Sequence, residues 1–96
     1  MVKVKHTGEF YSDLRSVLEE DENYQELVDL AVERFVKNPK DTRLEVHPLK
    51  RRMKDKWAFS VDDDVRIVFE WLRKRTVRFL AIGGHPRVYR RGMIRV

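Results

Sequence analysis

Four side chains in the second half of the sequence are of types suited to chemistry on a phosphate ester. Arg66 interrupts an alternating apolar run, His85 and Tyr89 follow the glycines that end the next run, and His47 precedes Pro48 in a shorter segment. An arginine fork binds phosphate oxygens, a histidine transfers protons near neutral pH, and a phenol donates a hydrogen bond or stacks. This combination favours a phosphate ester over a carbonyl or a sugar as substrate.

Each of these residues also has a purely structural explanation. Arg66 could pair with Glu70 on the same strand face, or with an aspartate of the preceding turn, because an unpaired charge within a strand is costly. A histidine that follows two glycines or precedes a proline is commonly a surface turn residue. Asp64 could be no more than the last residue of an acidic turn. The sequence alone leaves both explanations open.

Length and composition restrict the class of protein. The chain of 96 residues is long enough for one small domain, residues 1–96, and it has no cysteine. The three histidines lack ligand spacing, the Asp62–Asp64 run lacks the rest of a calcium loop, and no glycine-rich phosphate loop occurs, so we expect neither metal nor cofactor. No apolar run approaches the ~20 residues of a membrane span, which predicts a cytoplasmic protein without a membrane partner.

Charge is divided unequally along the chain. Residues 1–42 hold six Lys/Arg against ten Asp/Glu, a balance of −4, whereas residues 43–96 hold fifteen against six, a balance of +9. A basic half of this kind predicts a face that binds a polyanion such as nucleic acid, although a solvated surface of mixed charge is the alternative. The basic residues gather in loops, and those expected to bind nucleic acid are Lys50, Arg51, Arg52, Lys54, Lys56, Arg87, Arg90 and Arg91.

Hydrophobic periodicity predicts an α+β fold. A strand is expected over residues 2–6, a helix capped by Thr7 over about 9–20, and a second helix from about 24 until Asn38-Pro39. Strands follow at 44–46, 56–61, 65–72 and 76–83, with Arg66 and the apolar residues at 65, 67 and 69 on opposite faces. The predicted order is β-α-α followed by a three- or four-stranded antiparallel sheet, with the helical hairpin packed on one face.

In this order, the blocks resemble the RelE/ParE superfamily of bacterial and archaeal toxins. Arg66-Ile-Val-Phe69 is similar to the Arg-Leu-Val-Tyr strand of RelE- and YoeB-like members. Gly83-Gly-His-Pro-Arg-Val-Tyr89 is similar to the Gly-x-His-x-x-x-aromatic ending of YafQ-like members, and Glu45-Val-His-Pro-Leu-Lys50 to their His-x-Leu segment. The resemblance covers the chain from Phe10 to Tyr89 and implies the same β-α-α-sheet fold.

The resemblance also implies roles for individual residues. Arg66 would contact the scissile phosphate, His85 and His47 would act as general acid or base, and Tyr89 would stack or donate a hydrogen bond. Asp64 and Lys50 would be further candidates for the active site. The sequence departs from each subgroup, since Ser60 stands where YafQ-like toxins have a histidine, and those toxins lack an arginine at the place of Arg66. RelE-like toxins have basic residues at the place of His85, so the identity of the general base stays open.

The activity implied by the resemblance is that of a toxin in a type II toxin–antitoxin system. Such a protein is a ribosome-dependent, metal-independent endoribonuclease that cleaves mRNA through attack of the 2′-hydroxyl and so inhibits translation. Its partners would be the ribosome, mRNA and a cognate antitoxin, a short, acidic, partly disordered protein with a DNA-binding domain. Two alternatives share the fold: a ParE-like poison that binds DNA gyrase, and an inert relative kept for its interaction with a partner.

Overall fold

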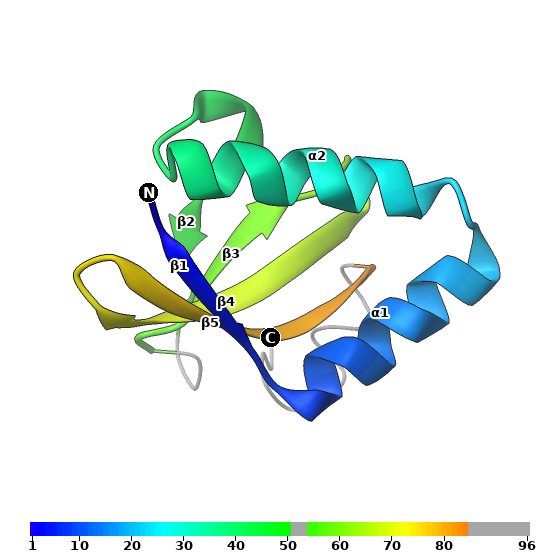
Figure 1. Cartoon of the computed structure of the whole chain (residues 1–96), viewed down its shortest axis with the longest axis horizontal. Helices are drawn as coiled ribbons and strands as arrows, with labels where there is room; N and C mark the ends of the chain where they lie inside the picture. Colours follow the sequence, from blue (N-terminus) through cyan, green and yellow to red (C-terminus); the bar gives the residue numbers. More distant parts are fainter. Residues whose placement is uncertain (51–53, 85–96) are drawn as a thin grey trace.

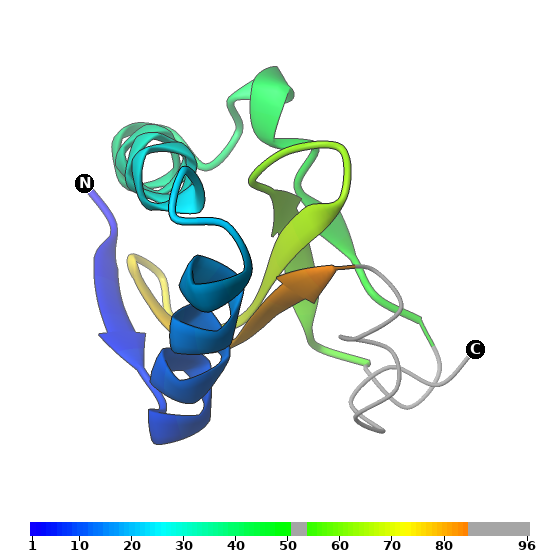
Figure 2. The ribbon, with the colours of Figure 1, turned by 90° about the vertical axis from the view of Figure 1, so that its right-hand side faces the viewer.

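The computed structural model describes residues 1–50 and 54–84, in which two helices pack on one face of a five-stranded sheet (Figures 1 and 2). These elements confirm the predicted α+β class. In chain order they are β1 (Lys3–His6), α1 (Gly8–Glu20), α2 (Tyr24–Lys37), the 3₁₀ turn η1 (Thr42–Leu44), β2 (His47–Pro48), β3 (Trp57–Ser60), β4 (Val65–Arg73) and β5 (Thr76–Gly84).

The strands lie in the order β1-β5-β4-β3-β2. β2, β3, β4 and β5 pair antiparallel with their neighbours in sequence, which confirms the predicted antiparallel sheet. β1 adds to the edge of β5 in parallel, with Val4 opposite Val77, and makes the sheet mixed. The two helices provide the long connection that leads the chain from β1 to the opposite edge of the sheet.

The helical hairpin begins at the predicted cap. The side chain of Thr7 accepts a hydrogen bond from the backbone N–H of Phe10 at 3.0 Å, and its hydroxyl donates to the carbonyl of Leu80 in β5 at 3.3 Å. Asp21 ends α1 and accepts from the backbone N–H of Asn23 at 3.0 Å, so the acidic run forms the turn between the helices. One buried carboxyl group was not predicted from the sequence: Asp13 of α1 accepts from the backbone N–H of Ile82.

The main core lies between the helices and the sheet. The ring of Phe35 in α2 stacks on Phe59 of β3, with centroids 4.5 Å apart, and meets the edge of Phe69 in β4 at 4.8 Å. The predicted alternation of β4 is confirmed, because its odd-numbered residues Val65, Ile67 and Phe69 join this core. The other buried members are Phe10, Val17, Val28, Ala31, Leu44, Val77, Phe79 and Ile82.

A second, smaller cluster lies across the sheet from the helices. Val68 of β4 belongs to it, together with Leu49, Ala58, Leu80 and Ala81. An irregularity in the β4–β5 register sets Val68 opposite Ala81 but Phe69 opposite Phe79, so Leu80 is the extra residue of a β-bulge. The bulge allows Phe79 and Leu80 to be buried together. Arg66 shares this face, and so the helices leave its side of the sheet uncovered.

The strand predicted over 44–46 is wrong. Asp41 accepts from the backbone N–H of Arg43 at 3.0 Å, which turns residues 42–44 into a 3₁₀ helix and buries Leu44 in the main core. Glu45 then adopts a left-handed conformation, with φ 50° and ψ 44°. An extended ladder cannot pass through that conformation, so pairing begins only at His47.

Candidate active site

Arg66 is the second residue of β4, and it lies between Ser60 of β3 and Gly83 of β5. Its side chain is half-buried, and Nη1 donates a hydrogen bond of 2.5 Å to the hydroxyl oxygen of Ser60. Glu70, the partner considered from the sequence, instead accepts from Lys56 at 2.9 Å and from Arg78 at 3.2 Å. The hydrogen-bond partner of Arg66 is therefore a neutral hydroxyl, and the Arg66 charge also acts on the carboxylate of Asp62 in the preceding turn, where it helps to lower the pKa.

Glu45 is the second hydrogen-bond partner of Ser60. The hydroxyl of Ser60 donates its single proton to Oε1 of Glu45 at 3.2 Å and accepts from Arg66 with a lone pair. Glu45 reaches Ser60 across 15 positions of sequence, from the loop between η1 and β2. The result is a chain of hydrogen bonds from a carboxylate through a buried hydroxyl to a guanidinium.

His47 is hydrogen-bonded to the same glutamate. Its Nδ1 lies 2.8 Å from the backbone carbonyl oxygen of Glu45. A carbonyl only accepts, so Nδ1 carries the proton, and a neutral ring has its lone pair on Nε2. His47 is opposite Ala58 in the β2–β3 ladder, which sets it on the same face of the sheet as Arg66. The structure therefore sets two of the predicted catalytic residues on one face of the sheet, and it corrects the placement of His47, which belongs to the short strand β2.

Asp64 lies against Gly84, the last residue of β5. Its carboxylate oxygens lie 3.3 and 3.5 Å from the position that a Cβ would take at Gly84, so a side chain there would press against them. Gly84 immediately precedes His85 in the sequence. His85 and Tyr89 themselves lie outside the described residues, and their predicted roles are not tested.

Some of the predicted phosphate-binding residues lie within the described part of the chain, and the others lie outside it. Lys50 and Lys54 are exposed, whereas Lys56 is part of the ion-pair network with Glu70 and Arg78 and has some of its charge offset. The remaining predicted binding residues fall beyond the part of the chain that the structure describes: Arg51, Arg52, Arg87, Arg90 and Arg91.

Sequence reasoning missed the two residues that connect the site. Ser60 was noted only as a departure from a related pattern, and Glu45 only as part of a motif. A signal for Ser60 existed, because a turn centred on Asp62–Asp64 sets it opposite Arg66. No comparable signal marks Glu45, whose contact depends on a left-handed backbone.

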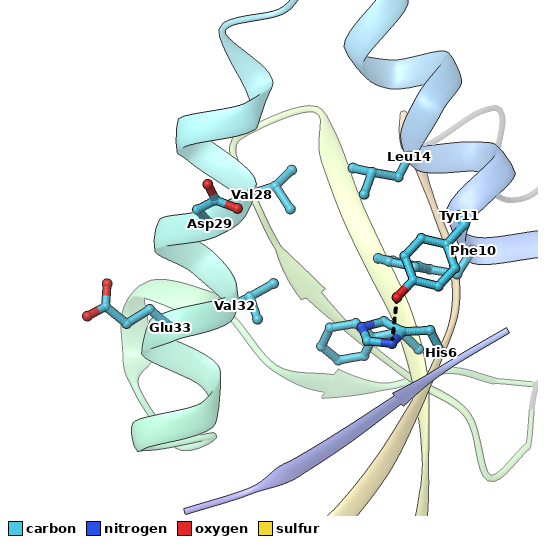
Figure 3. Close-up of a pocket in the computed structure, with 9 residues that line it drawn as sticks. His6, Phe10, Tyr11, Leu14, Val28, Asp29, Val32 and Glu33 are labelled. Carbon is cyan, nitrogen blue, oxygen red and sulfur yellow. Dashed lines mark hydrogen bonds between the residues drawn. The ribbon is translucent and has the colours of Figure 1, made fainter. Parts of the chain in front are cut away.

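A separate hollow lies on the opposite side of the sheet, between the two helices (Figure 3). It has a volume of 360 Å³, and Leu14, Val28 and Val32 point toward it while Asp29 and Glu33 lie on the outer side of α2. The hydroxyl of Tyr11 lies 3.2 Å from Nδ1 of His6 at its edge. This hollow is mostly apolar and is remote from Arg66 and His47.

Two further findings concern metals and membranes. Within residues 1–50 and 54–84, no group of three or more histidine, aspartate or glutamate side chains is arranged to hold a metal ion. In the same part of the chain, neither helix has the length and apolar character that crossing a membrane requires.

No family model and no curated protein matches the sequence, but solved structures do. A crystal structure of YafQ from E. coli strain BL21(DE3) has a TM-score of 0.75 at 18% identity, covering 93% of this chain and 99% of that chain. A YoeB/ParE toxin from Agrobacterium tumefaciens has a TM-score of 0.73 at 16% identity, covering 88% and 99%. A chain of the E. coli DinJ-YafQ toxin–antitoxin complex has a TM-score of 0.69 at 18% identity, covering 92% and 97%. The protein therefore has the fold of YafQ and of the YoeB/ParE toxin, which is the fold that the sequence resemblance implied.

Proposed function

We propose that this protein is the toxin of a type II toxin–antitoxin pair and that it cleaves mRNA on the ribosome without a metal ion. The observation that carries the proposal is the arrangement around Glu45: a guanidinium held by a neutral hydroxyl, and a histidine whose free nitrogen is set by the backbone. Both lie on the face of the sheet opposite α1 and α2, in a fold shared with toxins. A phosphate ester is the substrate that uses this pair best.

In the proposed reaction, the 2′-oxygen of RNA attacks the adjacent phosphorus and the bond from phosphorus to the 5′-oxygen breaks. Nε2 of His47 accepts the 2′-hydroxyl proton, and Arg66 stabilises the charge on the non-bridging oxygens. His85 donates a proton to the leaving 5′-oxygen, and Tyr89 stacks on a base or donates a hydrogen bond. The products are a 2′,3′-cyclic phosphate and a 5′-hydroxyl. The reverse assignment, with His85 as base and His47 as acid, uses the same atoms; Asp64 and Lys50 are further candidates.

The ribosome has a defined part in this proposal. Lysines and arginines of the basic half bind RNA phosphates, and the ribosome holds the mRNA so that its 2′-oxygen is in line with the leaving oxygen. The proposed binding residues are Lys50, Arg51, Arg52, Lys54, Lys56, Arg87, Arg90 and Arg91. Because this small site has few groups to align the substrate, naked RNA should be cut poorly.

The proposed partner is a cognate antitoxin. The DinJ-YafQ complex supports this inference, because YafQ, which has the same fold, was crystallised with its antitoxin. A basic half with a balance of +9 suits a short, acidic segment that becomes ordered on binding. We place both proteins in the cytoplasm, where the ribosomes are.

A translation assay tests the proposal. Purified protein added to translating ribosomes should cut transcripts within reading frames, and Arg66→Ala should lower kcat by about 10²–10³-fold. Arg78→Ala is the matched control, because it removes another arginine from the same sheet face at a place outside the proposed site. Intact transcripts with inhibited gyrase supercoiling would indicate the ParE-like activity, and neither effect would indicate an inert relative.

A further inference from the structure

Glu45 is connected by hydrogen bonds to His47 directly and to Arg66 through Ser60. The carboxylate of Glu45 accepts from Ser60, which accepts from Arg66, while the backbone carbonyl of Glu45 accepts from Nδ1 of His47. The side chain of Glu45 thus acts on the position of the proposed cation, Arg66, and its main chain on the tautomer of the proposed base, His47. Neither Glu45 nor Ser60 is needed to bind the phosphate in the mechanism above.

The carboxylate determines which way the Ser60 hydroxyl is oriented. A serine hydroxyl rotates freely unless an acceptor fixes its proton. Oε1 of Glu45 takes this proton, so the lone pairs of Ser60 remain directed to Nη1 of Arg66. Without Glu45, the hydroxyl could turn its proton toward the guanidinium, and the contact would be repulsive. Ser60 is 7% exposed, so water has little access to replace this acceptor.

The backbone of Glu45 has a left-handed conformation, which is costly in free energy for a residue other than glycine. Its φ is 50°, within the left-handed region. Strain of this kind persists where the surrounding structure requires it, and it concentrates at functional sites. A glycine would adopt the same backbone without strain and would keep the carbonyl for His47, but it would lack the carboxylate.

We infer that Glu45 is a positioning residue that orients Arg66 through Ser60 and fixes the His47 tautomer through its carbonyl, so that cation and base face the same phosphodiester. This inference rests on the proposed function for its consequence, since it specifies how the same site is assembled. Glu45 acts through its neighbours and does not touch RNA. Its loss should therefore lower kcat and leave KM unchanged.

Glu45→Gly tests the carboxylate in the ribosome cleavage assay. We expect kcat to fall by about tenfold to a hundredfold, the value of one hydrogen-bonded charged contact, while KM is unchanged and Tm is equal or higher because strain is relieved. Ser60→Ala should cause the same loss, and Glu45→Gln, which keeps an acceptor oxygen, a smaller one. In an Arg66→Ala background, Glu45→Gly should have no further effect.

Asp55→Gly is the matched control. Asp55 is also an exposed acid with a left-handed backbone, at φ 74°, so its replacement relieves similar strain without touching Ser60 or His47. It should leave kcat unchanged. Wild-type kcat in Glu45→Gly, or a full additional loss in the Arg66→Ala background, would overturn the inference.

Nuclear magnetic resonance separates this inference from the proposed function. In the wild type, ¹⁵N shifts of His47 should show the proton on Nδ1, and rotation of the Arg66 guanidinium should be slow. Glu45→Gly and Ser60→Ala should both accelerate that rotation and leave the tautomer unchanged. A proton on Nε2 of His47, or unchanged rotation in both variants, would overturn the inference whatever the nuclease assay gives. Absence of cleavage by the wild type would instead remove the proposed function.

Discussion

The hydroxyl of Tyr24 donates a 2.7 Å hydrogen bond to Oδ2 of Asp62, 38 residues away in the sequence. Tyr24 begins α2, and Asp62 lies in the turn between β3 and β4. Oδ1 of Asp62 accepts in addition from the backbone N–H groups of Asp64 and Val65, at 2.9 and 2.7 Å. One carboxylate thus joins the helical hairpin to the hairpin that carries Arg66.

Tyr24→Phe should lower the free energy of unfolding by about 1 kcal/mol. The change removes a hydrogen bond to an ionised acceptor but keeps the ring, and exposure to solvent reduces the loss. Urea unfolding at neutral pH measures it. Tyr11→Phe is the matched control, because the Tyr11 hydroxyl contacts His6 at an exposed site, and the substitution should cost less. Equal losses in the two variants would contradict this role for Tyr24.

The same pair predicts a stability that declines at both pH extremes. Burial opposes ionisation of Asp62, but the N–H of Val65, the hydroxyl of Tyr24 and the N–H of Asp64 together hold its pKa below the ordinary 3.8. Its contribution is therefore present above pH 3.8 and is lost as the pH falls below that value. The hydrogen bond to Asp62 and burial raise the pKa of Tyr24 from 10.0 to about 12. Its contribution is therefore complete below pH 10 and is lost as the pH rises toward 12.

Differential scanning calorimetry across pH checks this prediction. The difference in Tm between the wild type and Tyr24→Phe isolates the pair from other titrating groups. That difference should be constant from about pH 5 to 9 and should shrink on both sides. A difference that persists unchanged at pH 12 would contradict the assignment at the alkaline end.

The two histidines should differ in the pH dependence of cleavage. If His47 is the base and His85 the acid, each alanine substitution should lower kcat by about 10²–10⁴-fold. His47→Ala should abolish the fall of kcat at low pH, and His85→Ala the fall at high pH. Single-turnover cleavage on ribosomes across pH measures both. If His47→Ala instead abolished the fall of kcat at high pH, and His85→Ala the fall at low pH, the two roles would be exchanged. Unaltered cutting by His85→Ala would remove that residue from the site.

Lys54 should contribute to ribosome binding rather than to chemistry. It is exposed in the connection between β2 and β3, and charge reversal in Lys54→Glu should weaken binding more as salt is lowered. The slope of log K against log salt should become shallower by about one or more, while kcat at saturation stays within about twofold of the wild type. Lys37→Glu, on α2 away from the site, is the control. An unchanged salt slope would remove Lys54 from the interface.

The C-terminal residues should matter more to the antitoxin than to cleavage. Residues 92–96 include Met93, Ile94 and Val96, an apolar composition that suits a partner surface. Deleting them should raise the dissociation constant for the antitoxin, measured by calorimetry, by a larger factor than it lowers kcat. Unaltered antitoxin affinity in the truncated protein would remove this tail from the interface.

Local pattern in the sequence determined most of the elements. The alternation at 65–72 put Arg66 on one face and Val65, Ile67 and Phe69 on the other, because successive side chains of a strand point to opposite sides. Thr7 was predicted as a cap because its hydroxyl satisfies an N–H only three residues away. Such features depend on neighbours in the chain, and their geometry is the same in any fold.

Only the tertiary structure decided what faces Arg66. The strand predicted at 44–46 is wrong because residues 42–44 form a 3₁₀ turn that buries Leu44 in the main core, and Glu45 then reverses the backbone. That reversal brings Glu45 to Ser60 and His47, contacts that no periodicity encodes. The parallel pairing of β1 with β5 and the burial of Asp13 against Ile82 were likewise decided by tertiary structure. Each joins residues separated by about 70 positions, so it depends on how the helices pack on the sheet rather than on the local sequence.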